Sequence, residues 1–403
     1  MTIALHPLAE KAEIIRGVTF SKRDAFAEKR DGTLPVIRAG NIQDQLDLDD
    51  DLVFVPAKLV SERQRLRRGD IVMCTSSGSA DIVGKTAYAD NDWNGSFGAF
   101  CAVVRPKEDK CYPRYLFHYL RSPEFRNWTK NSSGVNIKNI RKSELDEIAV
   151  PFPNIHEQRR IAAILDKADA IRRKRQQALA LADDFLKSVF LEMFGDPETN
   201  PKQLPQEELG ELLERIDSGH SPKCEARPAA EDEIGILKVS SISSTHFKPE
   251  ENKAVFEGYP IDERNLVHSG DLLFSRKNTY QLVGASAIVE NVHGKLAMPD
   301  LIFRLVPRPD RKIEIPYLWM LLTQDSIRER LRKVAGGSAA SMPNIGKERL
   351  RSVLLPIAKP EDQVQFTKYY SKRISLKKKL QENLTVTEDL FASLSQRAFR
   401  GEL

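Results

Sequence analysis

A stretch near the middle of the chain has the spacing of a long helix that lies along another helix. Between residues 151 and 194, mostly apolar side chains recur at alternating intervals of three and four residues. This spacing is typical of a coiled-coil seam. The predicted seam comprises Ile161, Ile164, Ala168, Ile171, Arg175, Ala178, Ala182, Phe185 and Val189.

The same pattern returns 205 residues later, between residues 356 and 399, without a gap. Gln158 corresponds to Gln363 and Phe194 to Phe399. Solenoid repeats are about 20 to 50 residues long, so this period indicates a duplication of a whole domain. The second seam comprises Phe366, Tyr369, Arg373, Leu376, Leu380, Asn383, Thr387, Leu390 and Leu394.

Each helix is about 35 residues long, or roughly 50 Å at 1.5 Å per residue. A single amphipathic helix usually packs into an ordinary core, but two with one register favour a spacer or a docking surface. The apolar residues left over from the first seam form a second stripe, which predicts a second partner. The predicted partner-binding residues are Leu165, Leu179, Leu186 and Phe190.

Composition describes a globular protein with room for two or three domains. Of the 403 residues, 41% are hydrophobic and 30% charged, and the net charge of +5 permits a polyanionic partner without demanding one. No run of 18 apolar residues and no secretory signal is found, so we expect a cytoplasmic protein. The four cysteines have no metal-ligand spacing and are expected to be reduced and structural.

The segments before the two long helices contain short strands and turns in the same order. In the first half we expect strands or strand-turn units at residues 34–42, 68–74, 82–87, 99–105 and 148–150, with a short helix at 113–120. In the second half the corresponding segments are residues 236–242, 269–275, 282–287 and 353–355, with a short helix at 316–322.

The loops differ between the halves although the apolar strand positions agree. Residues 75–81 are rich in serine, whereas the corresponding residues 276–280 read Arg-Lys-Asn-Thr-Tyr. Side chains of these types bind phosphates and base edges, although polar loops can also be merely solvated. We therefore interpret the chain as one scaffold that presents two different polar surfaces.

Motifs for chemistry are missing. A methyltransferase needs a glycine-rich cofactor loop and an Asn/Asp-Pro-Pro-aromatic tetrapeptide, and neither occurs. Carboxylates with metal-ligand spacing, a Walker loop and a nucleophile motif are absent as well. The sequence thus predicts a binding subunit without catalytic activity of its own.

Two motifs resemble a known family, the specificity subunits of type I restriction-modification systems. They are the segment PFPNIHEQRRIAAIL at residues 151–165 and the chain end LSQRAFRGEL at residues 394–403. The resemblance covers the whole chain. One departure is Pro360-Glu-Asp-Gln363, where the first helix has His156-Glu-Gln158.

The resemblance implies an α+β architecture with two tandem target-recognition domains, mixed and mostly β with short helices. Two long helices that pair as an antiparallel coiled coil would separate these domains, giving an internal pseudo-twofold repeat. The implied boundaries are residues 1–150 and 198–355 for the domains, and 151–197 and 356–403 for the helices.

The resemblance also implies partners. The chain would bind double-stranded DNA, two modification subunits that methylate adenine, and restriction subunits that cleave. It would bind no cofactor itself, while its partners would use S-adenosylmethionine, ATP and Mg²⁺. No membrane association is expected.

The candidate DNA-binding residues are polar or basic and lie in the predicted loops, including the segments that end in Asn-Ile before each long helix. In the first half they are Lys22, Arg38, Asn41, Ser76, Ser77, Lys85, Asn136, Lys138 and Asn139. In the second half they are Lys223, Lys238, Arg276, Lys277, Asn278, Tyr280, Ser338, Ser341, Asn344 and Lys347.

Two other readings remain open from the sequence. One is a non-catalytic coiled-coil scaffold that binds other proteins, and the other is a fused or stand-alone methyltransferase, against which the missing motifs argue. The DNA-reading hypothesis predicts a target of two short words separated by unread base pairs. Because the loops differ, the two words should differ too.

Overall fold

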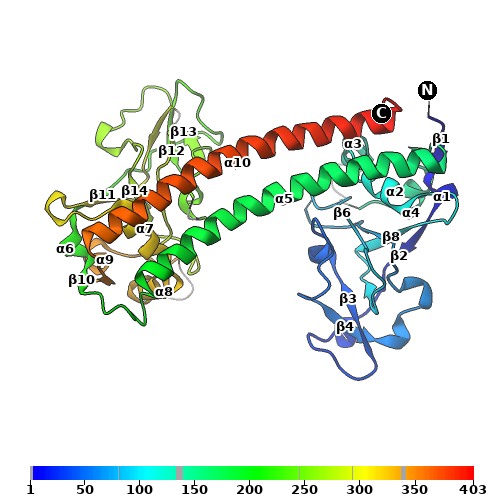
Figure 1. Ribbon diagram of the computed structural model, residues 1–403, viewed down its shortest axis with the longest axis horizontal. Coiled ribbons are helices and arrows are strands. Elements are labelled where there is room, and N and C mark those ends of the chain that lie inside the picture. The colour runs from blue at the N-terminus through cyan, green and yellow to red at the C-terminus, as the bar shows by residue number, and fades with distance from the viewer. Residues whose placement is uncertain (1–2, 80, 133–138, 245, 293, 337–341) are drawn as a thin grey trace. The chain divides into compact units, whose positions relative to one another are not determined.

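The computed structural model describes residues 3–79, 81–132, 139–244, 246–292, 294–336 and 342–403. The chain divides into two compact units. Unit 1 consists of residues 1–177 and 380–403, and unit 2 consists of residues 178–379. Each unit combines a globular part with portions of both long helices (Figure 1). The division therefore falls within the helices and not at their ends.

The described residues of unit 1 form three small sheets. An antiparallel sheet in the order β2-β8-β5-β6 carries most of the core, and β3 pairs with β4 antiparallel and with β7 parallel. The third sheet pairs β1 with β9. The strands are β1 (Leu5–Pro7), β2 (Ala12–Arg16), β3 (Thr33–Ile37), β4 (Val53–Pro56), β5 (Ile71–Cys74), β6 (Thr86–Tyr88), β7 (Ser96–Phe97), β8 (Cys101–Pro106) and β9 (Ala149–Pro151).

Short helices cover these sheets and connect them to the first long helix. The helices are α1 (Leu8–Lys11), α2 (Pro113–Tyr119), α3 (Pro123–Ser132), α4 (Lys142–Glu147) and α5 (Ile155–Phe194), with 3-10 turns η1 (Lys22–Asp24), η2 (Ala39–Asn41), η3 (Ala57–Leu59) and η4 (Glu62–Gln64). Helix α2 begins at the predicted proline, whose missing N–H costs nothing in the first turn.

Unit 2 repeats the arrangement, with sheets in the orders β11-β17-β14-β15, β13-β12-β16 and β10-β18. Its strands are β10 (Gln206–Glu208), β11 (Leu213–Ser218), β12 (Ile234–Leu237), β13 (Asn252–Ala254), β14 (Leu272–Ser275), β15 (Ser286–Ile288), β16 (Lys295–Ala297), β17 (Ile302–Pro307) and β18 (Leu354–Pro356). Its helices are α6 (Leu209–Leu212), α7 (Ile315–Thr323), α8 (Asp325–Val334), α9 (Lys347–Arg351) and α10 (Pro360–Arg400), with η5 (Val239–Ile242), η6 (Glu263–Asn265) and η7 (Pro309–Arg311).

The strands expected at residues 82–87 and 282–287 are much shorter than predicted. Residues 81–84 and 281–284 form turns, and only β6 and β15 follow them. Gly84 and Gly284 adopt φ values of +80° and +78°, a left-handed conformation that interrupts a strand. The prediction of a strand over the whole of each apolar run was therefore wrong, because the glycine within each run lies in a turn.

The two long helices run antiparallel within each unit. In unit 1, Arg160 of α5 donates to the carbonyl of Leu403, while Arg175 donates to the carbonyl of Asn383 and to the Thr387 hydroxyl. In unit 2, the rings of Phe190 and Phe366 lie 5.4 Å apart. Increasing residue numbers on α5 thus face decreasing numbers on α10. The predicted α+β fold with paired long helices is confirmed.

The predicted seam has two positions in each heptad, and the structure shows that one of the two is wrong by one residue. Ile161, Ala182, Phe366, Arg373 and Thr387 are buried as predicted. Of the intervening predicted positions, Ile171, Phe185, Leu376, Asn383 and Leu390 are exposed, whereas Ile164, Ala178 and Tyr369 are half-buried. The buried residues next to them follow the equally regular positions 165, 186, 370 and 384.

The predicted partner stripe on α5 is consequently wrong. Leu165, Leu186 and Phe190 are fully buried in the cores of their units, and Leu179 is half-buried. Apolar pairs such as Phe185-Leu186 offer two neighbouring stripes with the same heptad spacing, so the spacing cannot select between them. Packing against the globular part and α10 selects the second stripe, and the first remains at the surface.

Buried glutamines fasten both helix starts to the globular parts. Gln158 accepts a hydrogen bond from the Tyr112 backbone N–H at 2.8 Å and donates to the Pro153 carbonyl at 2.8 Å. Gln363 makes the equivalent bonds with Glu314 at 3.0 Å and Ala358 at 2.7 Å. The imperfect Glu-Gln motif of the second helix therefore keeps the residue that makes these contacts.

A cluster of charges joins the helices to the globular part in unit 2. Asp183 of α5 accepts from Arg373 and Lys377 of α10 and lies 3.1 Å from His246. Burial alone would raise the pKa of Asp183, but the hydrogen bonds from His246, Lys377 and Arg373 outweigh it and hold the pKa well below its ordinary value. The carboxylate is thus ionised whenever the unit is folded near neutral pH.

Neighbouring substitutions test the corrected seam. We expect Leu186→Ala to lower the free energy of unfolding by about 2–5 kcal/mol, because it leaves a cavity in a closed core. Phe185→Ala should change it by less than about 0.5 kcal/mol, because that ring is exposed. Chemical denaturation of the two variants measures the difference. Equal losses would contradict the assignment of the seam.

The Asp183 cluster should give unit 2 a pH-dependent stability. Because the folded-state pKa is depressed, the stabilisation is present above the unfolded pKa of about 3.9 and is lost as pH falls through the folded value. We expect Asp183→Asn to cost about 2 kcal/mol at pH 7, since the side chain is one-third exposed and partly screened. The difference should shrink below about pH 4.

The neighbouring variant Asp184→Asn provides the control, because Asp184 is exposed on the same helix. Denaturation curves of the wild type and both variants between pH 7 and pH 3 supply the measurement. An Asp183→Asn loss that does not change with pH would show that the cluster does not act through ionisation.

Candidate nucleic-acid interface

Two polar segments meet at one edge of the main sheet in unit 1. Strand β5 ends at Cys74, and the following loop lies beside the segment that precedes α4. Ser76 and Asn139 form an isolated antiparallel bridge, and the N–H of Ile140 donates to the Thr75 carbonyl at 2.8 Å. We call residues 75–79 and 139–140 the first loop pair.

Unit 2 builds the same backbone arrangement from different side chains. Lys277 bridges Asn344, and the N–H of Ile345 donates to the Arg276 carbonyl, again at 2.8 Å. Residues 276–280 and 344–345 form the second loop pair. Main-chain bonds hold both pairs, so the side chains were free to diverge.

The two loop pairs differ in charge and in hydrogen-bonding groups. The first presents the hydroxyls of Ser76 and Ser77 beside the Asn139 amide, while the buried Thr75 hydroxyl donates to the Phe100 carbonyl at 3.2 Å. The second contains Arg276, whose Nε donates to Asn344 Oδ1 at 3.1 Å. Hydroxyl, amide and guanidinium groups are donors and acceptors suited to phosphates and base edges. The two surfaces would therefore favour different sequences.

The structure brings together part of the predicted set. The residues that gather at the loop pairs are Ser76, Ser77 and Asn139 in unit 1 and Arg276, Lys277, Asn278 and Asn344 in unit 2. Tyr280 follows in the same loop and is exposed, and Lys347 opens α9 with its ammonium 2.5 Å from the Ile216 carbonyl. Asn136, Lys138, Ser338 and Ser341 lie outside the described residues.

Other predicted residues lie apart from the loop pairs. Lys22 and Lys223 are exposed in separate segments. The Arg38 guanidinium is 2.5 Å from the Asp51 carboxylate, and the Lys238 ammonium is 3.5 Å from Glu251. Lys85 lines a different cavity together with Asp44 and Arg173.

Asn41 was predicted wrongly. Its side chain is buried, accepts from the Arg38 N–H at 2.8 Å and donates to the Asp50 carbonyl at 2.7 Å. Both polar atoms are thus used to hold the turn after β3. An asparagine in a Gly-Asn turn looks like a surface residue in the sequence, and only the fold shows that it is internal.

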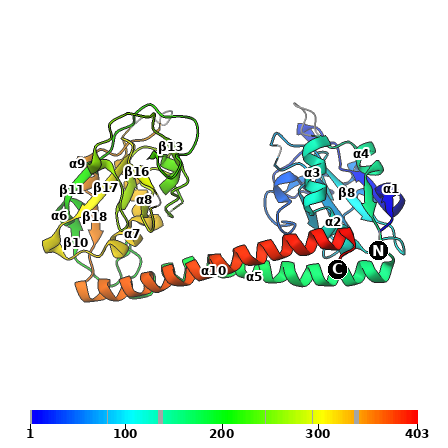
Figure 2. The same cartoon turned by 90° about the horizontal axis from the view of Figure 1, so that it is seen from above.

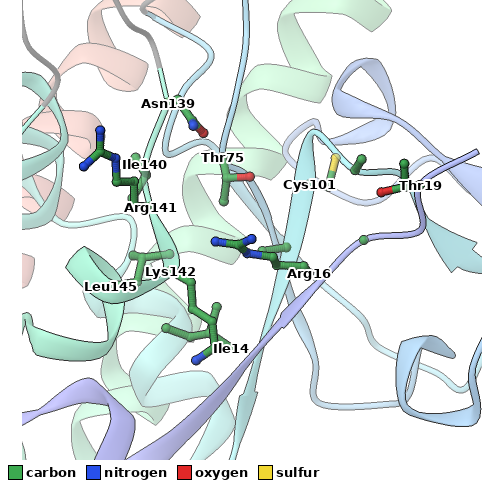
Figure 3. Close-up of a pocket in the computed structure, with 13 residues that line it drawn as sticks. Ile14, Arg16, Thr19, Thr75, Cys101, Asn139, Ile140, Arg141, Lys142 and Leu145 are labelled. Carbon is green, nitrogen blue, oxygen red and sulfur yellow. The ribbon is translucent and has the colours of Figure 1, made fainter.

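Sequence reasoning missed three residues beside the first loop pair. Arg16, Thr19 and Arg141 line a cavity together with Thr75 and Asn139 (Figure 3). Arg141 directly follows the Asn-Ile pair, which was a usable signal. Arg16 ends a strand far away in the sequence, and only the pairing of β2 with β8 brings it here.

The described part of the chain contains no group of three His, Cys, Asp or Glu side chains that could hold a metal ion. Burial raises the pKa of the Cys101 and Cys111 thiols to about 12, so both are protonated near neutral pH. Within the described residues, no helix is long and apolar enough to cross a membrane.

Comparisons with known proteins agree with this architecture. Residues 6–181 match the family described as Type I restriction modification DNA specificity domain. The EcoKI specificity subunit of Escherichia coli strain K12 is 29% identical, with 98% of this chain and 88% of that protein covered. The StySPI specificity subunit of Salmonella potsdam is 28% identical, with 99% and 89% covered.

Two solved structures share the fold. A chain from a type I R-M system has a TM-score of 0.55 at 18% identity and covers 100% of this chain and 98% of its own. The S subunit of a type I restriction-modification system from M. genitalium has a TM-score of 0.53 at 14% identity, with 98% and 96% covered. The resemblance seen in the sequence is thereby confirmed, and the chain is similar over nearly its full length to type I restriction enzyme specificity subunits.

Proposed function

We propose that this chain is the DNA-reading subunit of a type I restriction-modification complex and that each unit reads one word of a split target. The observation that carries the proposal is the pair of loop clusters, which share main-chain hydrogen bonds but differ in side chains. A protein-interaction scaffold would not need two such unlike polar surfaces on one framework. The names of the relatives also favour the DNA-reading function.

The two words should differ in sequence. The first loop pair offers neutral hydroxyl and amide groups, and the second offers Arg276 and Lys277. Arginine and lysine favour the O6 and N7 acceptors of guanine, whereas asparagine can pair with adenine in two hydrogen bonds. An asymmetric target follows from this difference.

Catalysis would belong to partner subunits. The sequence lacks the methyltransferase, nuclease and nucleotide-binding motifs that the reactions require. Modification subunits would supply methyl transfer to adenine from S-adenosylmethionine, and restriction subunits would supply ATP- and Mg²⁺-dependent cleavage. This chain would select the DNA on which they act.

The exposed apolar residues of the long helices form the proposed docking surfaces. Leu181 and Phe185 of α5, in unit 2, are each more than half exposed. Their repeat equivalents on α10, 205 residues later, are Val386 and Leu390 in unit 1, which are equally exposed. Exposed apolar groups at matching positions indicate one kind of contact made twice, which fits two copies of a modification subunit.

Exchange of one recognition part tests the two-reader proposal. Replacing residues 201–350 with the corresponding segment of a relative should change one word of the methylated target and leave the other unchanged. The reason is that each loop pair is built within its own unit. Methylation profiling of host DNA measures the result, and replacing residues 1–150 instead is the reciprocal control. A simultaneous change of both words in either exchange would contradict the proposal.

Charges placed on the docking surfaces should remove partners one at a time. We expect Leu181→Glu with Phe185→Glu to lose one of two modification subunits, and Val386→Glu with Leu390→Glu to lose the other, because burying unpaired carboxylates is costly. The combined variant should bind none. Native mass spectrometry of the reconstituted complexes gives the stoichiometry.

Ala180→Glu is the matched control, because Ala180 is exposed on the same helix and gains the same charge but lies about 100° or more around the helix from Leu181 and Phe185. Its complexes should keep both modification subunits. Full assembly of the combined variant would show that the partners dock elsewhere.

A further inference from the structure

A cavity of about 250 Å³ lies beside the first loop pair in unit 1. It lies between β2, β8 and the segment that leads into α4, and Thr75 and Asn139 of the loop pair form part of its wall. Figure 3 shows the Arg16 guanidinium extending into the space between Thr75 and Lys142. The cavity is therefore continuous with the surface that we assign to DNA.

Strand geometry explains why Arg16 points into this cavity. Side chains alternate along a strand, so Arg16 and Ile14 project from the same face of β2. Ile14 is buried against Leu145 in the core, while Arg16 lies one step further, where the core ends and the loops begin. Its cross-strand neighbour is Ala102, whose small side chain leaves room.

The lining of the cavity is cationic. Arg16, Arg141 and Lys142 line it, and no acidic residue is among the lining residues. The Lys142 ammonium is held by Asp146 at 2.6 Å, whereas Arg16 forms no ion pair with the described residues. A guanidinium without a carboxylate partner, beside hydroxyl and amide groups, is suited to bind an oxyanion such as phosphate.

The corresponding cavity of unit 2 is lined by Ser218, Gly219 and Lys347, and Asp217 and Asp262 line it as well. Phe303 occupies the position of Ala102 and is fully buried, and Ser218 and Gly346 occupy the positions of Arg16 and Arg141. The Arg276 guanidinium and the Lys347 ammonium lie over the Phe303 ring at 5.0 and 5.7 Å. In unit 2 the positive charge is in the loop pair, whereas in unit 1 it flanks a neutral loop pair.

We propose that Arg16 binds a backbone phosphate of the DNA beside the word that unit 1 reads, with Arg141 adding to the positive field at the rim. This inference rests on the proposed function. Phosphate contacts fix the register of a protein on the duplex, while the neutral groups of the loop pair would read base edges. The phosphate in question is a DNA phosphodiester, although free phosphate shares its chemistry.

The salt dependence of DNA binding tests the role of Arg16. The full chain, assembled with its modification subunits, is titrated with duplex DNA carrying its methylation target over a range of salt concentrations. Loss of one phosphate contact lowers the slope of log K against log salt by about one. We expect Arg16→Gln to lower the slope by this amount and to leave the methylated target sequence unchanged. Lys378→Gln, the same change of charge on the exposed face of α10, should leave the slope unaltered.

A second variant closes the cavity without removing a charge. Ala102→Phe copies the residue that unit 2 carries at the equivalent position and should reproduce the effect of Arg16→Gln. Neutral methylphosphonate groups, placed singly along the duplex, locate the phosphate. One position near the first word should weaken wild-type binding about tenfold and should have no further effect on Arg16→Gln.

The outcomes separate the two levels of the proposal. If the wild-type complex does not select a DNA sequence, the proposed function itself fails. If it selects DNA but Arg16→Gln keeps the wild-type slope, or no methylphosphonate position is coupled to Arg16, the phosphate site is wrong. If inorganic phosphate raises the melting temperature of the chain but no methylphosphonate position is coupled to Arg16, the cavity binds free phosphate. This result would also overturn the inference.

Discussion

Burial of one stripe of each long helix against the other helix and a globular part is the interaction on which both units depend. Leu186, Phe190 and Phe366 are buried in the core of unit 2, and Leu165 and Phe399 are buried in the core of unit 1. Each fully buried side chain of this size contributes about 1.5–3 kcal/mol. Figure 2 shows α5 and α10 running side by side. The Asp183 cluster and the buried glutamines fix their positions, because the hydrogen bonds are satisfied only when each helix starts at its observed residue.

A scaffold fixed in this way leaves the recognition loops free to change. The N–H groups of Ile140 and Ile345 make the same backbone bond in both units and both follow an asparagine, while the side chains of residues 75–79 and 276–280 differ. A new specificity can then arise from new loop side chains while these backbone bonds are kept. The cavity beside Arg16 extends this principle, because unit 2 carries Ser218 and Phe303 at the positions of Arg16 and Ala102.

The sequence could predict the repeat, the long helices and the loops at which polar residues gather, because these follow from spacing and residue type, and the resemblance to the family implied that the helices pair antiparallel. It could not decide between two adjacent apolar stripes, since Phe185 and Leu186 fit the heptad equally well. Arg16 was hidden for a different reason, because strand pairing across about 85 residues brings it to the loop pair. The prediction for Asn41 was wrong because a polar side chain can make all its hydrogen bonds within its own turn.

The central claim is that one chain reads two unlike words. Selection of duplexes from a random library by the complete complex, followed by sequencing of the bound DNA, tests it most directly. The account predicts two short and different words, separated by a constant number of unread base pairs. A single uninterrupted word, two identical words or no enrichment at all would contradict it.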